Sequence, residues 1–178
     1  MYALLLVLAV LVGCGGGGGG LPAGTLETVS VELRLLDEEP LTAEVLWVDE
    51  NGDGFCDYGT FTLVLTLELS VTPKEGVVNP SPVAVEGAAV YFSPQAEGQP
   101  PVTASVFLSG ETRVEPGRTG VISAELDGRV EPGLLPALYS AYLSVKLREL
   151  YTDRTVSVPV NFVVKLVDEA HEGCALAP

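Results

Sequence analysis

The feature that most constrains this chain is a period of two residues in its hydrophobic pattern, which runs from Glu27 onward. Apolar and polar side chains alternate over residues 29–35, 61–71 and 156–166. Because neighbouring residues of a strand point to opposite faces of a sheet, such alternation predicts strands with one buried face. No stretch after residue 24 shows a helical period of 3.6 residues, so the pattern predicts an all-β fold. Further strands are expected at about 42–48, 83–92, 102–108, 120–127 and 140–150.

Turn signals separate these strands at the intervals of a β-sandwich. The sequence RVEPG occurs at 113–117 and again at 129–133, and Pro followed by Gly favours a type II turn. Residues 151–154 are expected to close a hairpin between the last two strands. Pro159 lies inside the final strand, where it has no N–H to donate, so it should face an open edge or a bulge. The acidic pair at 38–39 is expected to be a solvated turn.

The segments VEPGRTGVISAEL, LPALYSAYLSVKL and TVSVPVNFVVKLV resemble the second half of bacterial immunoglobulin-like sandwich domains over about residues 110–167. The resemblance implies one immunoglobulin-like antiparallel β-sandwich, which we expect to cover residues 27–168. It also implies a spacer, adhesion or binding role, with Tyr139 or Tyr142 as a corner tyrosine or a core residue.

The N-terminal sequence predicts export. Residues 2–12 form an uncharged apolar run that is too short for a membrane-spanning helix and fits a signal peptide. The run leads into Leu-Val-Gly-Cys, which resembles the lipobox of bacterial lipoproteins, although no Lys or Arg precedes it. The resemblance implies a signal peptide over 1–13, lipidation of Cys14, and a membrane anchor in the cell envelope. Gly15 after the cysteine favours the outer membrane or cell surface over the inner membrane.

The segment at 14–26 predicts a flexible tether, because it contains the glycine run 15–20. Ten flexible residues reach roughly 18 Å, which is enough to hold a domain just off a membrane.

One acidic loop is a candidate calcium site. Oxygen-bearing side chains and one carbonyl fall at the spacing of the D-x-[DN]-x-[DN]-G pattern, with Gly54 at the bend. Thr60 stands where an EF-hand has its bidentate Glu, so the loop resembles the shorter calcium loops of extracellular bacterial proteins, with a dissociation constant of about 10⁻⁴–10⁻³ M. The alternative is an acidic turn without a metal. The expected ligands are Asp49, Asn51, Asp53, the Phe55 carbonyl and Asp57.

The chain has three cysteines. With Cys14 assigned to the lipid, Cys56 and Cys174 remain as an even pair in an exported protein. We expect a disulfide that ties the C-terminal tail, residues 169–178, to the acidic loop; the alternative is two free thiols.

The net charge of the chain and the absence of catalytic motifs narrow its possible functions. A formal net charge of −15 disfavours nucleic acid as a partner. His171 is the one histidine, and no nucleophile elbow, zinc spacing or phosphate-binding loop occurs. The sequence therefore favours a non-catalytic binding or spacer module that meets an envelope or extracellular protein or polysaccharide. The alternative is a small carbohydrate-active or hydrolytic enzyme that uses carboxylates.

Overall fold

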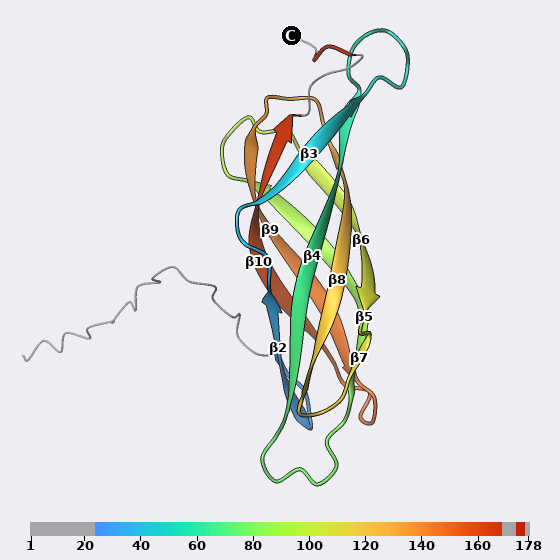
Figure 1. Cartoon of the computed structure of the whole chain (residues 1–178), viewed down its shortest axis with the longest axis vertical. Coiled ribbons are helices and arrows are strands. Elements are labelled where there is room, and N and C mark those ends of the chain that lie inside the picture. The colour runs from blue at the N-terminus through green and yellow to red at the C-terminus, as the bar shows by residue number, and fades with distance from the viewer. Residues whose placement is uncertain (1–23, 169–173, 177–178) are drawn as a thin grey trace, which may run out of the picture.

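The computed structural model describes residues 24–168 and 174–176, and all regular structure in that part of the chain is β (Figure 1). No helix in the described residues is long and apolar enough to cross a membrane. The strands are β1 (Gly24–Thr25), β2 (Val29–Leu35), β3 (Leu41–Val48), β4 (Tyr58–Pro73), β5 (Val83–Pro94), β6 (Val102–Gly110), β7 (Arg113–Val114), β8 (Arg118–Val130), β9 (Ala137–Glu149) and β10 (Thr155–Asp168).

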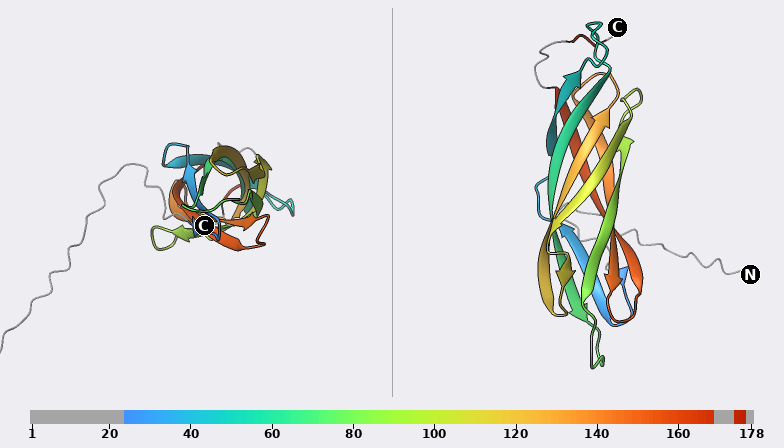
Figure 2. Two further views of the ribbon diagram at one scale, coloured as in Figure 1. Left: turned by 90° about the horizontal axis from the view of Figure 1, so that it is seen from below. Right: turned by 90° about the vertical axis from the view of Figure 1, so that its right-hand side faces the viewer.

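The strands form two sheets. The first sheet has the order β6-β8-β4-β2-β1, and the second has the order β7-β5-β9-β10. Strand β3 belongs to both, because its first five residues pair in parallel with β10 and its last three pair antiparallel with β4. Seen along the long axis, the two sheets curl around one interior (Figure 2). This confirms the predicted single all-β sandwich, in which the β3–β10 ladder is the parallel exception among the described strands.

The core lies between the two inward faces. Apolar residues of β4 at odd positions from Phe61 to Val71 are buried, and their even neighbours face outward. The inward residues of β9 and of the second half of β10 alternate in the same manner. Each predicted strand is present, because a period of two leaves no other way to bury one apolar face.

The two RVEPG segments form different turns. In the first, Arg118 N–H donates to the Glu115 carbonyl at 3.1 Å and Gly117 has a φ of +77°, as a type II turn requires. In the second, Gly133 has no positive φ; a Cβ there would lie 2.9 Å from the Pro100 ring. The second glycine is thus needed for close packing.

The edge of β10 is protected by two residues. Val163 N–H donates to the Glu39 carboxylate at 2.7 Å, so the amides of odd-numbered residues in this strand point away from β9. Pro159 has the same parity and lies where no described strand pairs with β10 on that side, so its missing N–H leaves no ladder bond unmade. Glu39 therefore caps an edge strand, where the sequence predicted only a solvated turn.

The molecule has two distinct ends, which strand β4 connects. Its 16 residues span about 50 Å at roughly 3.3 Å per residue. We call the end that holds residues 49–57 and 174–176 the loop pole, and the end that holds residues 24–29 and 149–154 the entry pole (Figure 1). Strand β1 falls in the segment expected to be tether, and Leu26 is buried, so the sandwich begins a few residues before Glu27.

Candidate functional site at the loop pole

The acidic loop connects β3 to β4. Asp57 N–H donates to the Val48 carbonyl at 2.8 Å and closes the base of the loop. Gly52 and Gly54 have φ values of +77° and +88°, which an L-residue adopts only with strain. These two glycines bend the chain so that the side chains between the strands turn back onto their own backbone.

The acidic and amide side chains of the loop accept hydrogen bonds from its backbone amides. Asp49 accepts from Gly52 at 2.6 Å and from Gly54 at 2.9 Å. Asn51 Oδ1 accepts from Asp53 N–H, and Asp53 Oδ1 from Phe55 N–H, both at 2.9 Å. Such bonds hold a tight loop in one conformation without help from a partner.

Asp57 links the end of the loop to its beginning. Its Oδ2 accepts from the amides of Glu50 at 2.8 Å and Asn51 at 3.3 Å, and its Oδ1 accepts from Asn51 Nδ2 at 3.2 Å. The structure thus brings the four expected side-chain ligands into one loop. Among the described residues, however, no three acidic, His or Cys groups converge on a point that would hold a metal. The loop offers oxygen atoms, which are the ligands that calcium prefers, and calcium binding stays a prediction.

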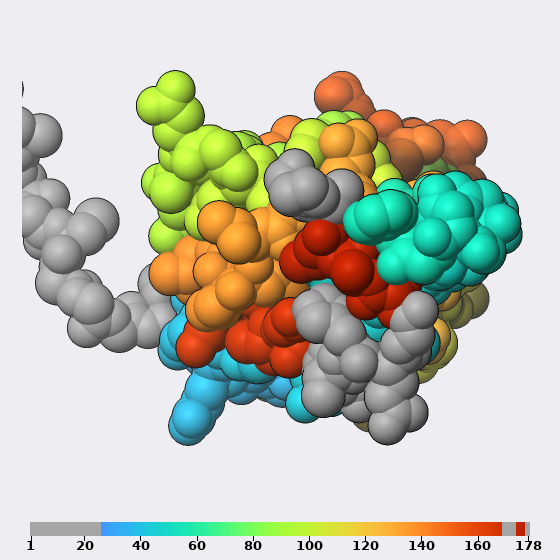
Figure 3. Space-filling model, turned by 90° about the horizontal axis from the view of Figure 1, so that it is seen from above, coloured from blue at the N-terminus to red at the C-terminus, as the bar shows by residue number. Residues whose placement is uncertain are grey.

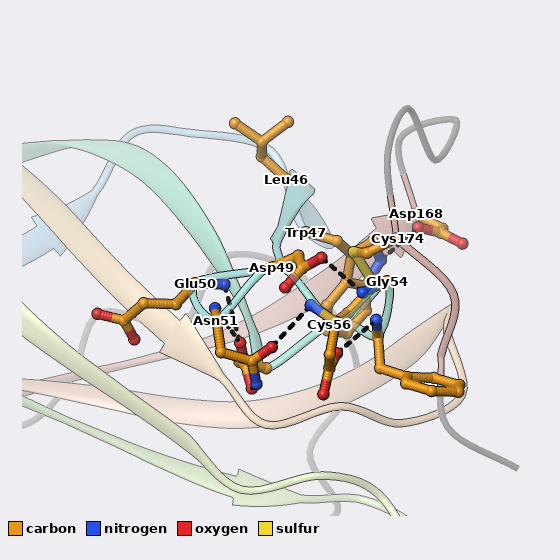
Figure 4. Close-up of a disulfide and its surroundings, with 12 residues drawn as sticks. Leu46, Trp47, Asp49, Glu50, Asn51, Gly54, Cys56, Asp168 and Cys174 are labelled. Carbon is orange, nitrogen blue, oxygen red and sulfur yellow. Dashed lines mark hydrogen bonds between the residues drawn. A yellow bond between two sulfur atoms is a disulfide. The ribbon is translucent and has the colours of Figure 1, made fainter.

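The predicted disulfide between Cys56 and Cys174 is confirmed, with a Cα–Cα distance of 5.1 Å (Figure 4). Backbone bonds extend the link, because Cys56 N–H donates to the Ala175 carbonyl and Ala175 N–H to the Gly54 carbonyl, both at 2.9 Å. Leu176 packs against the core. In the chain-entropy model, closing a loop of 118 residues contributes up to about 5 kcal/mol to stability.

Trp47 fixes the base of the loop to the second sheet. Its indole N–H donates to Asp168 Oδ1 at 2.6 Å, which joins the end of β3 to the end of β10 (Figure 4). Trp47 is 9 % exposed, whereas Leu46 beside it points outward. The base of the loop is therefore held in place by a buried side chain and its hydrogen bond to β10.

The surface of the loop pole is acidic, and two large apolar side chains are exposed on it. Residues 49–57 carry four carboxylates and no basic side chain. Phe55 in the loop and Leu134 in the turn before β9 are exposed large apolar residues. In the end-on view the loop, the tail residues and the turn lie next to one another (Figure 3). Charge of one sign on a preformed loop suits cations or basic partners.

A buried carboxylate at the entry pole was not singled out by the sequence. Glu149 is fully buried and accepts five hydrogen bonds, all from neutral donors. Burial would raise the pKa of its carboxyl, but the bonds from Thr152, Thr28 and Glu27 outweigh burial and lower the pKa to about 2. Nothing in the local sequence marks this glutamate, because four of its five donors lie about 120 residues away. The donors are Glu27 N–H, Thr28 N–H, Thr28 Oγ1–H, Val29 N–H and Thr152 Oγ1–H.

The two candidate corner tyrosines have different roles. Tyr139 is buried and donates its hydroxyl to the Pro100 carbonyl at 2.8 Å, and burial raises its pKa to about 12. It ties β9 to the turn between β5 and β6. Tyr142 faces outward and stacks on Tyr91 of β5, with ring centroids 4.8 Å apart. Cys14 and His171 lie outside the described residues.

A scan against protein-family models gives no match, and a search of curated proteins gives none. Among solved structures, this chain is similar to the CooA pilin subunit from enterotoxigenic Escherichia coli, with 12 % identity, a TM-score of 0.31 and coverage of 79 % of this chain and 99 % of that one. A FixG-related protein from Vibrio parahaemolyticus has 14 % identity, a TM-score of 0.30 and coverage of 78 % and 98 %. AggA, a fimbrial major subunit from Escherichia coli, has 10 % identity, a TM-score of 0.27 and coverage of 82 % and 98 %.

Proposed function

We propose that this chain is a non-catalytic envelope lipoprotein, anchored through Cys14, that presents its loop pole to a partner outside the membrane. The proposal rests on the positions of the two poles at opposite ends of the molecule. The described chain begins at Gly24 beside β2, near the entry pole, and the preorganised acidic loop lies at the far end of β4. A tether that enters there would direct the loop pole away from the lipid.

The order of the loop supports recognition as its role. Its side chains are already bonded to its backbone and a disulfide fixes its end, so little conformational entropy is left to lose when a partner docks. A basic protein segment or a polysaccharide with bound cations would complement its charge.

The buried carboxylate Glu149 does not support the alternative, a hydrolytic enzyme. Glu149 is the buried carboxylate among the described residues, and its hydrogen bonds hold it ionised against the backbone of residues 27–29. A general acid needs a raised pKa and access to substrate, and this group has neither.

The anchor is tested by mass spectrometry of the protein extracted from membranes of its native host. We expect a mature chain that begins at an acylated Cys14, and release of the Cys14→Ala variant into the soluble fraction. Ser would be a poorer choice of substitution, since it retains a nucleophilic hydroxyl. A mature chain that keeps residues 1–13 would contradict the proposal.

Calcium is proposed as a structural ion of the acidic loop. Each carboxylate oxygen has a second lone pair beside the one that faces an amide, so the donors to the ion would be Asp49, Asn51, Asp53, Asp57 and the Phe55 carbonyl. We expect millimolar calcium to raise the melting temperature of the intact chain. Asp53→Ala should abolish this rise, and Asp127→Ala, an exposed carboxylate of β8, should retain it. An equal response of the two variants would exclude the loop as the site.

A further inference from the structure

The outer face of the second sheet contains an uncharged field. Three neighbouring rows across β5, β9 and β10 carry no Asp, Glu, Lys, Arg or His, from the Ala89 row through the Tyr91 row to the Ser93 row. Their outward side chains are serines, an asparagine, two tyrosines and small apolar residues. The outer face of the first sheet differs, because it carries charged residues such as Glu68 and Asp127. In a chain of net charge −15, a neutral field of this size distinguishes the second sheet.

A pair of stacked tyrosines stands in the middle row. Tyr91 and Tyr142 are direct cross-strand neighbours, with ring centroids 4.8 Å apart and planes 18° apart. They remain 51 % and 40 % exposed, although aromatic rings of this size contribute most when they are covered. Asn161 continues the row on β10 and places an amide beside the Tyr142 ring.

Two hollows flank the tyrosine pair. One, of about 600 Å³, has a floor of small residues that includes Ala89, Ser144 and Ser157. The other, of about 380 Å³, lies beside Ser140 and Asn161 on the opposite side of the pair. Both volumes lie in the range of ligand sites. Along β5 the field extends over about 13 Å from residue 89 to residue 93, at roughly 3.3 Å per residue.

The charged side chains at the margins of the uncharged field form ion pairs or hydrogen bonds within the protein. At the first hollow, Lys146 Nζ lies 2.8 Å from Glu86 Oε2, and Glu86 also pairs with Arg148. Glu86 is the extra residue of a β-bulge, which turns its side chain toward these two cations. At the second hollow, Glu39 accepts from Val163 N–H and keeps a second oxygen to accept from a ligand hydroxyl.

We propose that this face binds a neutral polysaccharide chain, whose sugar rings stack on the Tyr91–Tyr142 pair and whose hydroxyls bond to groups in the two hollows. A sugar ring has an apolar C–H face that suits an aromatic ring and a rim of hydroxyls that suits serine, asparagine and carboxylate groups. The lack of an unpaired cation in the field and the acidity of the whole chain disfavour an anionic glycan. The inference goes beyond the proposed function, because it adds a second binding surface that is separate from the loop pole.

Affinity gel electrophoresis of the whole chain tests the proposal, with dextran, laminarin, xylan and galactomannan as neutral probes and polygalacturonate as the anionic probe. We expect at least one neutral probe to retard the protein. Tyr142→Ala and Tyr91→Ala should each weaken this binding about tenfold, as the loss of one aromatic stack implies. Tyr142→Phe should retain most of the binding, because it keeps the ring.

The controls separate stacking from folding and from non-specific adhesion. Tyr151→Ala at the entry pole and Phe107→Ala on the first sheet remove aromatic residues that are more exposed than the pair, and they should not change the retardation. Melting temperatures confirm that the variants are folded. The proposal is overturned if no neutral probe retards the protein, if only polygalacturonate does, or if both alanine variants at the pair bind like wild type. Such a result would not affect the proposed lipid anchor. An unmodified Cys14 would in turn not affect the proposal of glycan binding, so the two failures can be told apart.

Discussion

A buried carboxylate that bonds to neutral donors, Glu149, is the side chain that fastens the start of β2 to the second sheet. Its five donors come from Glu27, Thr28, Val29 and Thr152, so one side chain joins the start of the sandwich to the β9–β10 hairpin. Thr28 extends the junction, because its hydroxyl oxygen accepts from Ser81 N–H at 2.9 Å. Removing the charge would leave several buried donors without a full partner.

We predict that Glu149→Gln lowers the free energy of unfolding by about 2–4 kcal/mol, since the amide accepts fewer bonds and turns its own N–H₂ toward donors. Urea unfolding at neutral pH measures the loss. Glu75→Gln, an exposed carboxylate near the same pole, serves as the matched control and should change little.

The same substitution has a defined pH dependence. The pKa of Glu149 is lowered from 4.5 to about 2 in the folded protein, so its ionised form contributes stability that is fully present above pH 4.5. That contribution is lost as pH falls from about 4.5 to about 2. The difference in stability between wild type and Glu149→Gln should therefore shrink through this window, and a constant difference would show that the carboxylate charge is not the cause.

Residue spacing predicted the loop pole and missed Glu149. The ligand-like residues from Asp49 to Asp57 are close in sequence, so their spacing already shows that they can gather. The disulfide followed from counting cysteines. Glu149 and the Tyr91–Tyr142 pair depend on which strands become neighbours, and a single sequence does not contain that pairing.

At the scale of the strands, β4 and β8 approach closely where an aromatic ring covers a glycine. Phe61 pairs directly with Gly128, and a Cβ at Gly128 would lie 2.0 Å from the ring. The glycine is therefore a requirement of packing between the strands, and its backbone φ plays no part.

Gly128→Ala should destabilise the protein by about 1–3 kcal/mol, because the Phe61 ring must leave its position in the core. Gly87→Ala is the matched control, since a Cβ at that strand residue meets nothing within 4 Å. Melting temperatures of the two variants give the comparison. Equal melting temperatures would contradict this account of the β4–β8 contact.

The hydrophobic alternation predicted every long strand, but not the order of the strands in space. It placed the buried faces correctly because a shift of one residue would expose every core side chain. It gave no sign that β3 changes sheets halfway, since residues on both halves of β3 alternate in the same way. The two-residue strands β1 and β7 are too short to show any period.

At the scale of the whole molecule, unbalanced negative charge works against compactness. The chain has 24 acidic and 9 basic residues, and the four carboxylates at 49–57 lie together at one pole. Like charges on a small surface repel one another, and dissolved salt screens that repulsion within about 10 Å at 0.1 M ionic strength.

We predict that raising sodium chloride from about 0.01 M to about 0.15 M increases the melting temperature, because the screening length falls from about 30 Å to about 8 Å. The double variant Glu50→Gln, Asp53→Asn should show a smaller increase, since two charges are gone while the Asn oxygen can still accept from Phe55 N–H. Calorimetry at the two salt concentrations measures both. A melting temperature that falls with salt would mean that attractive pairs outweigh repulsion.

The junction at Glu149 also determines how the molecule would bear a pull. A force applied at Gly24 and opposed at the loop pole acts nearly along the strands, so the seven-residue β2–β4 ladder is loaded in shear and its bonds share the strain. Unzipping, in which bonds fail one at a time, would need a force across the strands. The carboxylate of Glu149 passes part of the same load to β9, so both sheets resist it together. The fold should therefore resist unfolding by a force applied along its long axis.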